Sequence, residues 1–397
     1  MRQPRLVADI YPGYNGSSLK NFRAVGDTLY FSAFDGISGF ELWKSNGTST
    51  GTRLVKDINP GGSSFPDDLT AVGDTLFFKA IGNGTGAELW RSNGSSAGTK
   101  IVKDLLPGLF SSGASTLTAV GDSLFFRATD GKTNGLWKSD GTSAGTKLVS
   151  GNLIVASKSY NVGAPFAAAV KSTLFFSGSD GRAGLELWKS NGTSAGTKFV
   201  REIRAGALGS EPQELTGVGD TLFFTANDGS TGRELWKSDG TSQGTIRVKD
   251  ILTGFSAGSP LSSEPLELTA VGNTLFFTAN DGITGRELWK SDGTPAGTTL
   301  VADIANPVVN GTSYPGVPSN PRELTAVGDT LFFTADGGDR GRGLWRSDGT
   351  SAGTVFVSDL GATGTAISEL TAVGRTLFFS HSAEGKGFEL WALDVTP

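Results

Sequence analysis

The sequence predicts an all-β protein, an eight-bladed β-propeller with four antiparallel strands in each blade. Three observations indicate this fold class: a repeat of about 50 residues, runs of consecutive apolar residues, and the way in which the two termini match the repeat. Every Trp of the 397-residue chain stands in a variant of Glu-Leu-Trp-Lys-Ser-Asp-Gly-Thr. These residues are Trp43, Trp90, Trp137, Trp188, Trp236, Trp289, Trp345 and Trp391.

One repeat unit shows the expected strands clearly. We expect strands over 215–219, 221–226, 233–238 and 246–251, joined by a Gly-Asp turn, a loop over 227–232 and an Asp-Gly-Thr turn over 239–245. Short strands joined by Gly- and Asp-rich turns are typical of an antiparallel meander. No segment has the hydrophobic period of an amphipathic helix.

The second strand of the unit is apolar on consecutive residues, as in Leu222-Phe223-Phe224. A strand with one face in water would alternate apolar and polar side chains, so these runs predict that both faces are covered. The blades of a propeller meet this condition because each packs between two neighbours. We therefore expect the Phe pairs and the Trp residues to form the core.

The two termini distinguish a closed propeller from an open solenoid. The last unit has its first three strands and ends soon after Trp391, whereas residues 5–10 match a fourth strand such as 100–104. The N-terminal strand is therefore expected to complete the last blade, which closes the ring and removes exposed sheet edges. We expect residues 1–397 to form this single domain.

Composition excludes several functions. The formal net charge is −5 without long blocks of like charge, which argues against nucleic acid or an anionic membrane as a partner. The chain has no Cys and one His, so disulfides, cysteine zinc sites and cysteine nucleophiles are excluded. No apolar run is long enough to insert across a bilayer, and residues 1–5 lack the apolar stretch of a signal peptide.

The repeat resembles that of the bacterial ELWxxDGT-repeat family. The motif Glu-Leu-Trp-x-Ser-(Asp/Asn)-Gly-(Thr/Ser) recurs along essentially the whole chain, although Asn134-Gly-Leu-Trp137 and Gly343-Leu-Trp345 lack the Glu and the last unit lacks the turn. The resemblance implies a bacterial protein that is secreted or exposed at the cell surface, and it implies no reaction. The Ser-Asp-Gly-Thr turn also looks like the Asp-box hairpin of sialidase-type propellers, where it is structural.

The alternating strand direction sorts the loops of each blade onto two faces. The loops between strands two and three and the connections between blades form what we call the loop face, and the Val-Gly-Asp and Asp-Gly-Thr turns form the turn face. The turns repeat almost unchanged, whereas the loops vary between blades, and binding sites commonly lie on such loops. Tyrosines there either contact a sugar or protein ligand or anchor the long connections. They are Tyr11, Tyr14, Tyr160 and Tyr314.

A second set of candidates is expected just before the innermost strand, near the mouth of a central channel. Carboxylates there would either bind a cation or a basic side chain, or be solvated rim acids paired with loop cations such as Arg322. The acidic residues at this position are Asp68, Glu214, Glu267, Glu323 and Glu369, and the other blades have Asn21, Thr116 and Ala167.

The loops between strands two and three add charged residues of both signs. Their Asp-Gly pairs favour hairpin turns over calcium binding, and we expect no other cofactor; the aspartates are Asp35, Asp130, Asp180, Asp228 and Asp281. Arginines in blades five to seven either meet an acidic sugar or partner carboxylate, or pair with neighbouring Glu residues; they are Arg233, Arg286, Arg340 and Arg342. The Glu of Glu-Leu-Trp recurs too regularly for one active site, and we expect it to satisfy strand ends and turns.

Evidence for catalysis is lacking in the sequence. His381 is the only His, is expected to be exposed, and is accompanied by no Gly-x-Ser-x-Gly turn. We predict a monomeric, non-catalytic binding module that recognises carbohydrate or a protein surface through the loop face. Two alternatives remain open, a purely structural ring of a larger surface protein and a hydrolase or lyase that acts through carboxylates.

Overall fold

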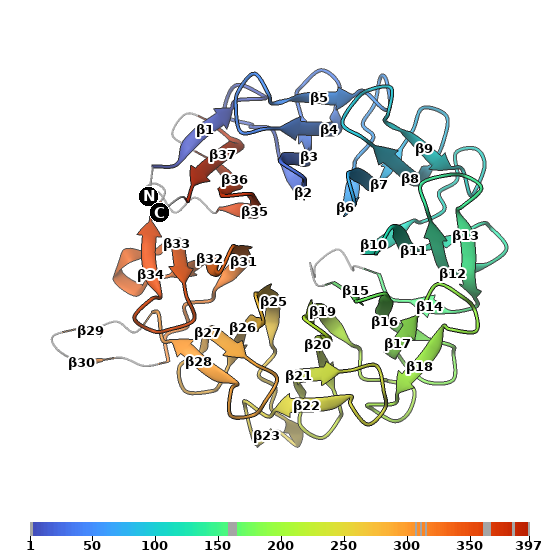
Figure 1. The fold of residues 1–397 in the computed structure, drawn as a ribbon. Coiled ribbons are helices and arrows are strands. Elements are labelled where there is room, and N and C mark those ends of the chain that lie inside the picture. The colour runs from blue at the N-terminus through green and yellow to red at the C-terminus, as the bar shows by residue number, and fades with distance from the viewer. Residues whose placement is uncertain are drawn as a thin grey trace. The chain divides into compact units, whose positions relative to one another are not determined.

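The computed structural model describes residues 3–157, 165–305, 308, 309, 312, 313, 316–359, 367–382 and 386–395. Within them the one helical element is a single 3-10 turn, η1 (Gly338–Arg340), which is far too short to cross a membrane. All other elements are strands (Figure 1). Eight sheets, each built on four antiparallel strands, are the blades of an eight-bladed β-propeller, so the predicted fold class is confirmed.

The chain divides into two compact units of four blades each. The first unit contains Met1–Leu153 and Thr365–Pro397, and the second contains Ile154–Gly364. Numbered in chain order, blades 1, 2, 3 and 8 belong to the first unit and blades 4 to 7 belong to the second.

The strands of the first unit follow the repeat closely. Blade 1 is β2 (Lys20–Val25), β3 (Thr28–Phe34), β4 (Phe40–Ser45) and β5 (Arg53–Lys56). Blade 2 is β6 (Asp67–Val72), β7 (Thr75–Ile81), β8 (Ala87–Ser92) and β9 (Lys100–Lys103). Blade 3 is β10 (Ser115–Val120), β11 (Ser123–Thr129), β12 (Asn134–Ser139) and β13 (Lys147–Gly151). Blade 8 is β35 (Ser368–Val373), β36 (Thr376–Ser382), β37 (Phe388–Asp394) and β1 (Arg5–Ala8).

The second unit has the same four-stranded sheets and some short additions. Blade 4 is β15 (Ala167–Val170), β16 (Thr173–Ser179), β17 (Glu186–Ser190) and β18 (Lys198–Arg201), with β14 (Ile154–Val155) added beside β16. Blade 5 is β19 (Gln213–Val218), β20 (Thr221–Asn227), β21 (Arg233–Ser238) and β22 (Ile246–Lys249). Blade 6 is β25 (Leu266–Val271), β26 (Thr274–Asn280), β27 (Arg286–Ser291) and β28 (Thr299–Ala302). Blade 7 is β31 (Arg322–Val327), β32 (Thr330–Asp336), β33 (Arg342–Ser347) and β34 (Val355–Ser358).

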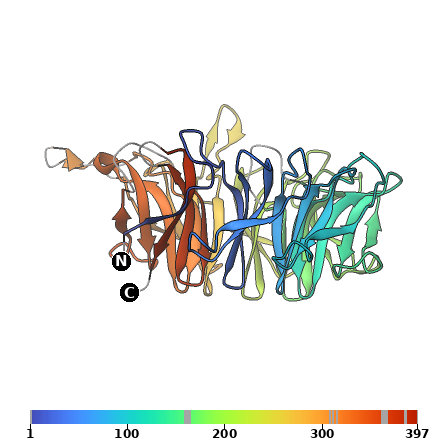
Figure 2. The ribbon, with the colours of Figure 1, turned by 90° about the horizontal axis from the view of Figure 1, so that it is seen from above.

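Two small hairpins interrupt the connections between blades of the second unit. They are β23 (Phe255–Ser256) with β24 (Ser259–Pro260), and β29 (Val308–Val309) with β30 (Thr312–Ser313). Figure 2 shows the first of these, in yellow, standing out beyond the ends of the blade strands. The hairpin of β23 and β24 therefore lies on the loop face.

Blade 8 joins the two ends of the chain in one sheet. Strand β1 pairs antiparallel with β37, with Arg5 opposite Ala392 and Leu6 opposite Trp391. The backbone N–H of Ile10 donates to Oε2 of Glu389 at 2.9 Å, which ties the second residue after β1 to the same blade. The predicted arrangement of three strands from one end and one from the other is confirmed.

The core lies between adjacent blades, as the consecutive apolar residues predicted. Phe223 and Phe224 are both buried although their side chains leave opposite faces of β20. Phe223 packs in one cluster with Phe277 and Trp289 of blade 6, whereas Phe224 packs in a cluster with Phe175 of blade 4. The Phe pair of blade 5 thus joins its blade to two neighbours, and removal of one such ring is expected to cost about 3–5 kcal/mol.

The Asp-Gly-Thr turn holds the turn face together by side-chain hydrogen bonds. In blade 5, Oδ1 of Asp239 accepts from the N–H of Thr241 at 2.8 Å and from its hydroxyl at 2.7 Å. These bonds, the hydroxyl first, lower the pKa of Asp239. Gly240 has φ of 87° and its carbonyl accepts from Lys189 of blade 4 at 2.8 Å. A residue with a side chain would be strained at that φ, which explains the recurring Gly.

Candidate functional site

The Glu of Glu-Leu-Trp is buried and binds the connection to the next blade. In blade 5, Glu234 accepts hydrogen bonds from the N–H of Ile251 at 3.1 Å, the N–H of Ser263 at 2.8 Å and the Ser263 hydroxyl at 2.6 Å. Burial raises the pKa of Glu234 to about 7, against the effect of these donors. The equivalent residues are also buried and bonded in this way: Glu41, Glu88, Glu186, Glu287 and Glu389. The prediction that this Glu satisfies turns is confirmed.

The acidic residues expected just before the innermost strand lie inside that strand, at a bulge. Glu214 has φ of 57°, and the pairing of β19 with β20 changes register between Gln213 and Thr216. Because the bulge lets the strand continue past Glu214, β19 begins at Gln213, two residues before the start that we expected from the sequence. Oε2 of Glu214 accepts from the N–H of Leu268 in blade 6 at 3.2 Å.

The same link between neighbouring blades recurs at this position. Glu267 accepts from the N–H of Leu324 at 3.3 Å, and Asp68 accepts from the N–H of Thr116 at 2.8 Å. Glu369 accepts from the N–H of Phe22 at 3.0 Å, and Glu323 has the same left-handed φ of 59°. Burial raises the pKa of Glu214 to about 7 and also raises that of Glu267. The carboxylates of Asp68, Glu214, Glu267 and Glu369 thus accept from backbone N–H groups of the following blade.

The arginines of the second unit are held by residues of the loop face. Arg233 is buried, and its guanidinium lies 3.4 Å from Glu211 and 3.9 Å from Glu264. Burial lowers its pKa, while both carboxylates raise it. Arg286 donates to the carbonyl of Glu264 at 2.8 Å. Pairing with neighbouring Glu residues, one of the two interpretations from sequence, therefore describes Arg233.

The remaining arginines are more exposed. Arg342 donates to the carbonyl of Asn320 at 2.8 Å and to the hydroxyl of Thr334 at 3.2 Å. Arg340 lies in η1, with its guanidinium carbon 5.6 Å from the centre of the Phe356 ring.

The tyrosine candidates differ in their surroundings. Tyr11 is half-buried, with its ring edge-on to Phe34 at a centroid distance of 5.3 Å. Tyr14 is 88% exposed. Tyr160 and Tyr314 lie outside the described residues. Tyr11 therefore anchors its connection, and Tyr14 is accessible to a ligand.

The loop aspartates act in turns. Oδ1 of Asp228 accepts from the N–H groups of Ser230 and Thr231, both at 2.8 Å, and Asp281 has the same bonds to its own loop. Among the described residues, no group of three or more His, Cys, Asp or Glu side chains is arranged to hold a metal ion.

His381 is buried, which corrects the prediction that it is exposed. Strand β36 runs on to Ser382 and pairs His381 with Glu389. The imidazole lies edge-on to Trp391, with ring centroids 5.3 Å apart. The sequence after the Phe pair resembles a loop because Ser380-His-Ser-Ala-Glu384 is polar, but its first residues still pair in the sheet.

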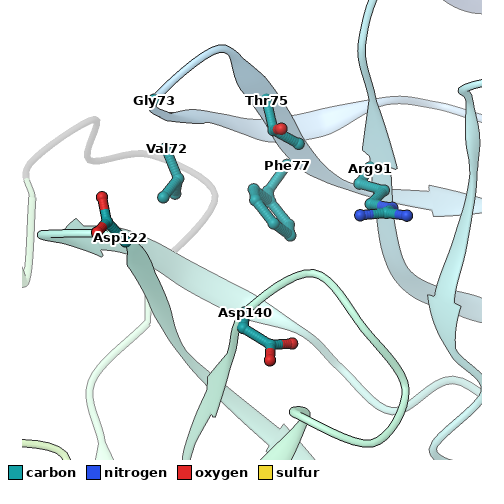
Figure 3. Close-up of a pocket in the computed structure, with 7 residues that line it drawn as sticks. All are labelled: Val72, Gly73, Thr75, Phe77, Arg91, Asp122 and Asp140. Carbon is teal, nitrogen blue, oxygen red and sulfur yellow. The ribbon is translucent and has the colours of Figure 1, made fainter.

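A cavity of about 150 Å³ lies on the turn face of the first unit, between blades 2 and 3 (Figure 3). Figure 3 shows the Phe77 ring between Val72 and Arg91, with Asp140 on the side of blade 3. The lining residues come from the Val-Gly-Asp turn, the Phe pair, the residue after Trp and the Asp-Gly-Thr turn. The repeat provides these positions in most blades, so this cavity does not distinguish one blade from another.

A larger cavity, of about 320 Å³, lies on the loop face of blade 4. Two aromatic rings line it, Trp188 and Phe199, which meet edge-on with centroids 5.9 Å apart. Two carboxylates also line it, Asp180 from the loop between β16 and β17, and Glu202 directly after β18. Phe199 is 44% exposed and both acids are exposed, so rings and charges are all accessible.

The sequence indicated this site only in part. Asp180 was among the loop aspartates, but Phe199 and Glu202 were missed. A signal was present: Glu202 stands where six of the other seven blades have Asp at the end of the fourth strand, blade 3 having Gly151, and Ala183 stands where blades 5 and 6 have Thr. Departures from the repeat of this kind are more informative than the repeat itself.

Comparisons with known proteins concern the fold. No protein-family model matches the chain, and no curated protein matches it. Prolyl oligopeptidase B from Galerina marginata is similar with a TM-score of 0.52 and 11% identity, over 94% of this chain and 56% of that chain. A puromycin-hydrolyzing peptidase of Mycobacterium tuberculosis is similar with a TM-score of 0.50 and 14% identity, over 96% of this chain and 62% of that chain.

A third similar structure is the β-propeller domain of the Trilobed protease from Pyrococcus furiosus, with a TM-score of 0.47 and 9% identity over 96% of each chain. The chain spans less than two thirds of the length of each of the two peptidases. At these identities the likeness concerns the propeller fold alone.

Proposed function

We propose that the chain is a non-catalytic binding module that holds a protein or carbohydrate ligand on its loop face. The observation that carries this proposal is where exposed large apolar side chains lie. On the connections between blades they are Tyr14, Phe65, Leu109, Phe110, Leu208, Phe255 and Val317, in hairpin loops they are Ile37 and Ile283, and on strands they are Leu148, Ile154, Phe199, Ile246 and Phe388. Within the described residues, the Val-Gly-Asp and Asp-Gly-Thr turns expose none of this size.

This distribution favours binding over a purely structural role. Exposed apolar side chains that gather into a patch mark a surface for a partner, and the loop face is where connections from several blades present such side chains. The turn face repeats the same hydrogen bonds in successive blades, whereas the loop face presents a different set of side chains in each. A rigid scaffold with variable loops is a common design for binding proteins.

The Glu-Leu-Trp repeat supports a further part of the proposal. We propose that the chain is one of the bacterial ELWxxDGT-repeat proteins, which implies that it is secreted or exposed at the cell surface. Separately, we propose that it acts as a monomer without a cofactor. The peptidase activities named for the similar structures belong to those proteins, and we transfer none of them.

The test is a screen of the purified chain on glycan and peptide arrays, with calcium and with a chelator. We expect reproducible binding that the double variant Tyr14→Ala, Phe255→Ser weakens. The matched control is Asp74→Ala, Asn273→Ala, which changes one exposed turn-face residue in each unit. Blank arrays, or equal losses from both double variants, would contradict a loop-face binding function, and loss with the chelator would contradict the absence of a metal.

A further inference from the structure

In blade 5, the position equivalent to the blade 4 cavity is occupied by a side chain of the protein, Arg247. Arg247 stands opposite Trp236 in the pairing of β22 with β21. Its Nη1 lies 3.7 Å from Oδ2 of Asp228 and 3.7 Å from Oδ2 of Asp250. A guanidinium therefore lies between the loop aspartate and the aspartate that ends the fourth strand.

Other blades show that the position beside the acid at the end of the fourth strand favours a cation. In blade 8, Lys386 from the loop before β37 forms an ion pair with Asp9. In blade 6, Leu300 takes the register of Arg247, and burial, with the nearby charge of Asp281, raises the pKa of Asp303. Two carboxylates that approach each other without a cation repel, whereas a guanidinium or ammonium removes the repulsion.

Blade 4 keeps the acids of this site but has no cation in the register of Arg247, and the basic residue that lines its cavity is Arg182 from the loop. Phe199 stands opposite Trp188, in the register of Arg247, and Asp180 and Glu202 replace Asp228 and Asp250. The cavity of about 320 Å³ opens there.

A second change leaves Asp180 accessible. In blade 5 the hydroxyl of Thr231 donates to Asp228 at 3.0 Å, but blade 4 has Ala183 at that position. Asp180 keeps the N–H of Arg182 at 3.1 Å and a 3.8 Å contact with the Arg182 side chain, which is 91% exposed. Exposed ion pairs contribute little, so a ligand can displace this contact.

We propose that the blade 4 cavity binds the guanidinium of an arginine side chain on a partner peptide, in the way that blade 5 holds Arg247. The planar group stacks against Trp188 and Phe199 and donates to Asp180 and Glu202. Glu186, at the base of the cavity, takes no part because its oxygens already accept from Ser210 and backbone N–H groups. This inference rests on the proposed binding function and names its ligand class.

The probe is Nα-acetyl-arginine amide, titrated into the full chain and followed by calorimetry and by Trp fluorescence. The matched ligand is the citrulline analogue, which has nearly the same shape and no charge. We expect saturable binding of the arginine compound with a Kd on the order of 1 mM, and binding of the citrulline compound weaker by about tenfold or more. Equal binding of the two compounds, or no saturable binding, would overturn the inference.

Variants in blades 4 and 5 test where the arginine compound binds. Phe199→Arg should refill the cavity with an internal guanidinium and abolish binding, and Glu202→Gln should weaken it about tenfold. Arg247→Ala should do the reverse, opening a second site in blade 5 and raising the stoichiometry from one to two. Asp281→Asn in blade 6 is the control and should leave binding unchanged. Thermal melts confirm that each variant is folded before it is titrated.

The outcomes separate this inference from the proposed function. If an array ligand is bound through the loop face but Phe199→Arg does not affect it and the arginine compound does not bind, the binding function stands and the blade 4 assignment fails. If arginine-containing peptides are bound and Phe199→Arg abolishes the signal, both stand. If arrays and titrations are both blank, both fail.

Discussion

The loop ends of blade 1 and blade 5 have the same backbone and different chemistry. The last pair of the central hairpin is Phe34 with Phe40 in blade 1 and Asn227 with Arg233 in blade 5. In blade 1 the two Phe rings lie 5.3 Å apart, and Phe40 stacks on Phe65 at 5.6 Å. In blade 5 that place holds the buried guanidinium of Arg233 between Glu211 and Glu264.

One residue pair further into the sheet, the two blades are alike. Ala33 stands opposite Glu41 in blade 1, and Ala226 stands opposite Glu234 in blade 5. The structure shared by the two blades therefore ends at the buried Glu. The residue pair beyond it is free to vary, because backbone hydrogen bonds hold that pair in register whatever its side chains are. This boundary indicates where side chains can change without loss of the fold.

The largest expected effect tests the shared part. Glu41→Ala and Glu234→Ala each remove the acceptor of several buried donors, and each should lower the free energy of unfolding by about 3–5 kcal/mol. Urea denaturation measures both. If one variant costs less than half as much as the other, the two blades do not share this part of the scaffold.

The pH dependence of stability should differ between the two blades. Burial raises the pKa of Glu234 to about 7 and also raises that of Glu41. Because the folded state holds these protons more tightly than the unfolded state, the contribution of each group to stability is greatest below its unfolded pKa and is lost as pH rises through the folded pKa.

Thermal melts between pH 5 and pH 8 measure this dependence. Each Glu should contribute a fall in stability with rising pH, of up to about 3 kcal/mol for Glu234. Glu234→Gln should flatten the profile more than Glu41→Gln. An unchanged slope in Glu234→Gln would mean that this carboxyl stays ionised in the folded protein.

The effect of salt on stability should differ between the loop ends of blades 1 and 5. Phe40→Ala is expected to cost about 2–3 kcal/mol and Arg233→Ala about 1–2 kcal/mol, since the first loses ring contacts and the second loses a partly screened ion pair. In 1 M NaCl the cost of Arg233→Ala should shrink, while that of Phe40→Ala should not. Chemical denaturation by urea at two salt concentrations provides the measurement. Equal salt responses would show that the two ends are held by the same forces.

The smallest effect is expected at Tyr14. Since its side chain is almost fully exposed, Tyr14→Ala should change the unfolding free energy by less than about 0.5 kcal/mol. A larger loss, measured by urea denaturation, would mean that Tyr14 anchors its connection instead of being available to a ligand.

Local features predicted most of the fold. The Phe pairs, the turn sequences and the fourth-strand match at the N-terminus each depend on neighbours in sequence, and the strands of blade 5 lie within a few residues of their predicted bounds. The Asp-Gly-Thr turn was predictable because its hydrogen bonds connect residues within one turn.

Features set by distant contacts were not predictable. The left-handed conformation of Glu214 depends on a bulge against β20, and the burial of His381 depends on its pairing with β37. The blade 4 cavity requires Phe199 and Glu202 to meet a loop that precedes them by about one hairpin, and only comparison among blades reveals it. A single repeat unit contains none of this information.

The pairing of β1 with β37 also has a consequence for biosynthesis. Ribosomes add about 5–20 residues per second, and β1 leaves the ribosome long before its partner exists. Blades 1 to 7 can form during translation, but Arg5–Ala8 must wait for Phe388–Asp394. Of the blade strands described, β1 is made before all the others but is paired among the last, and until then its edge is open to other chains.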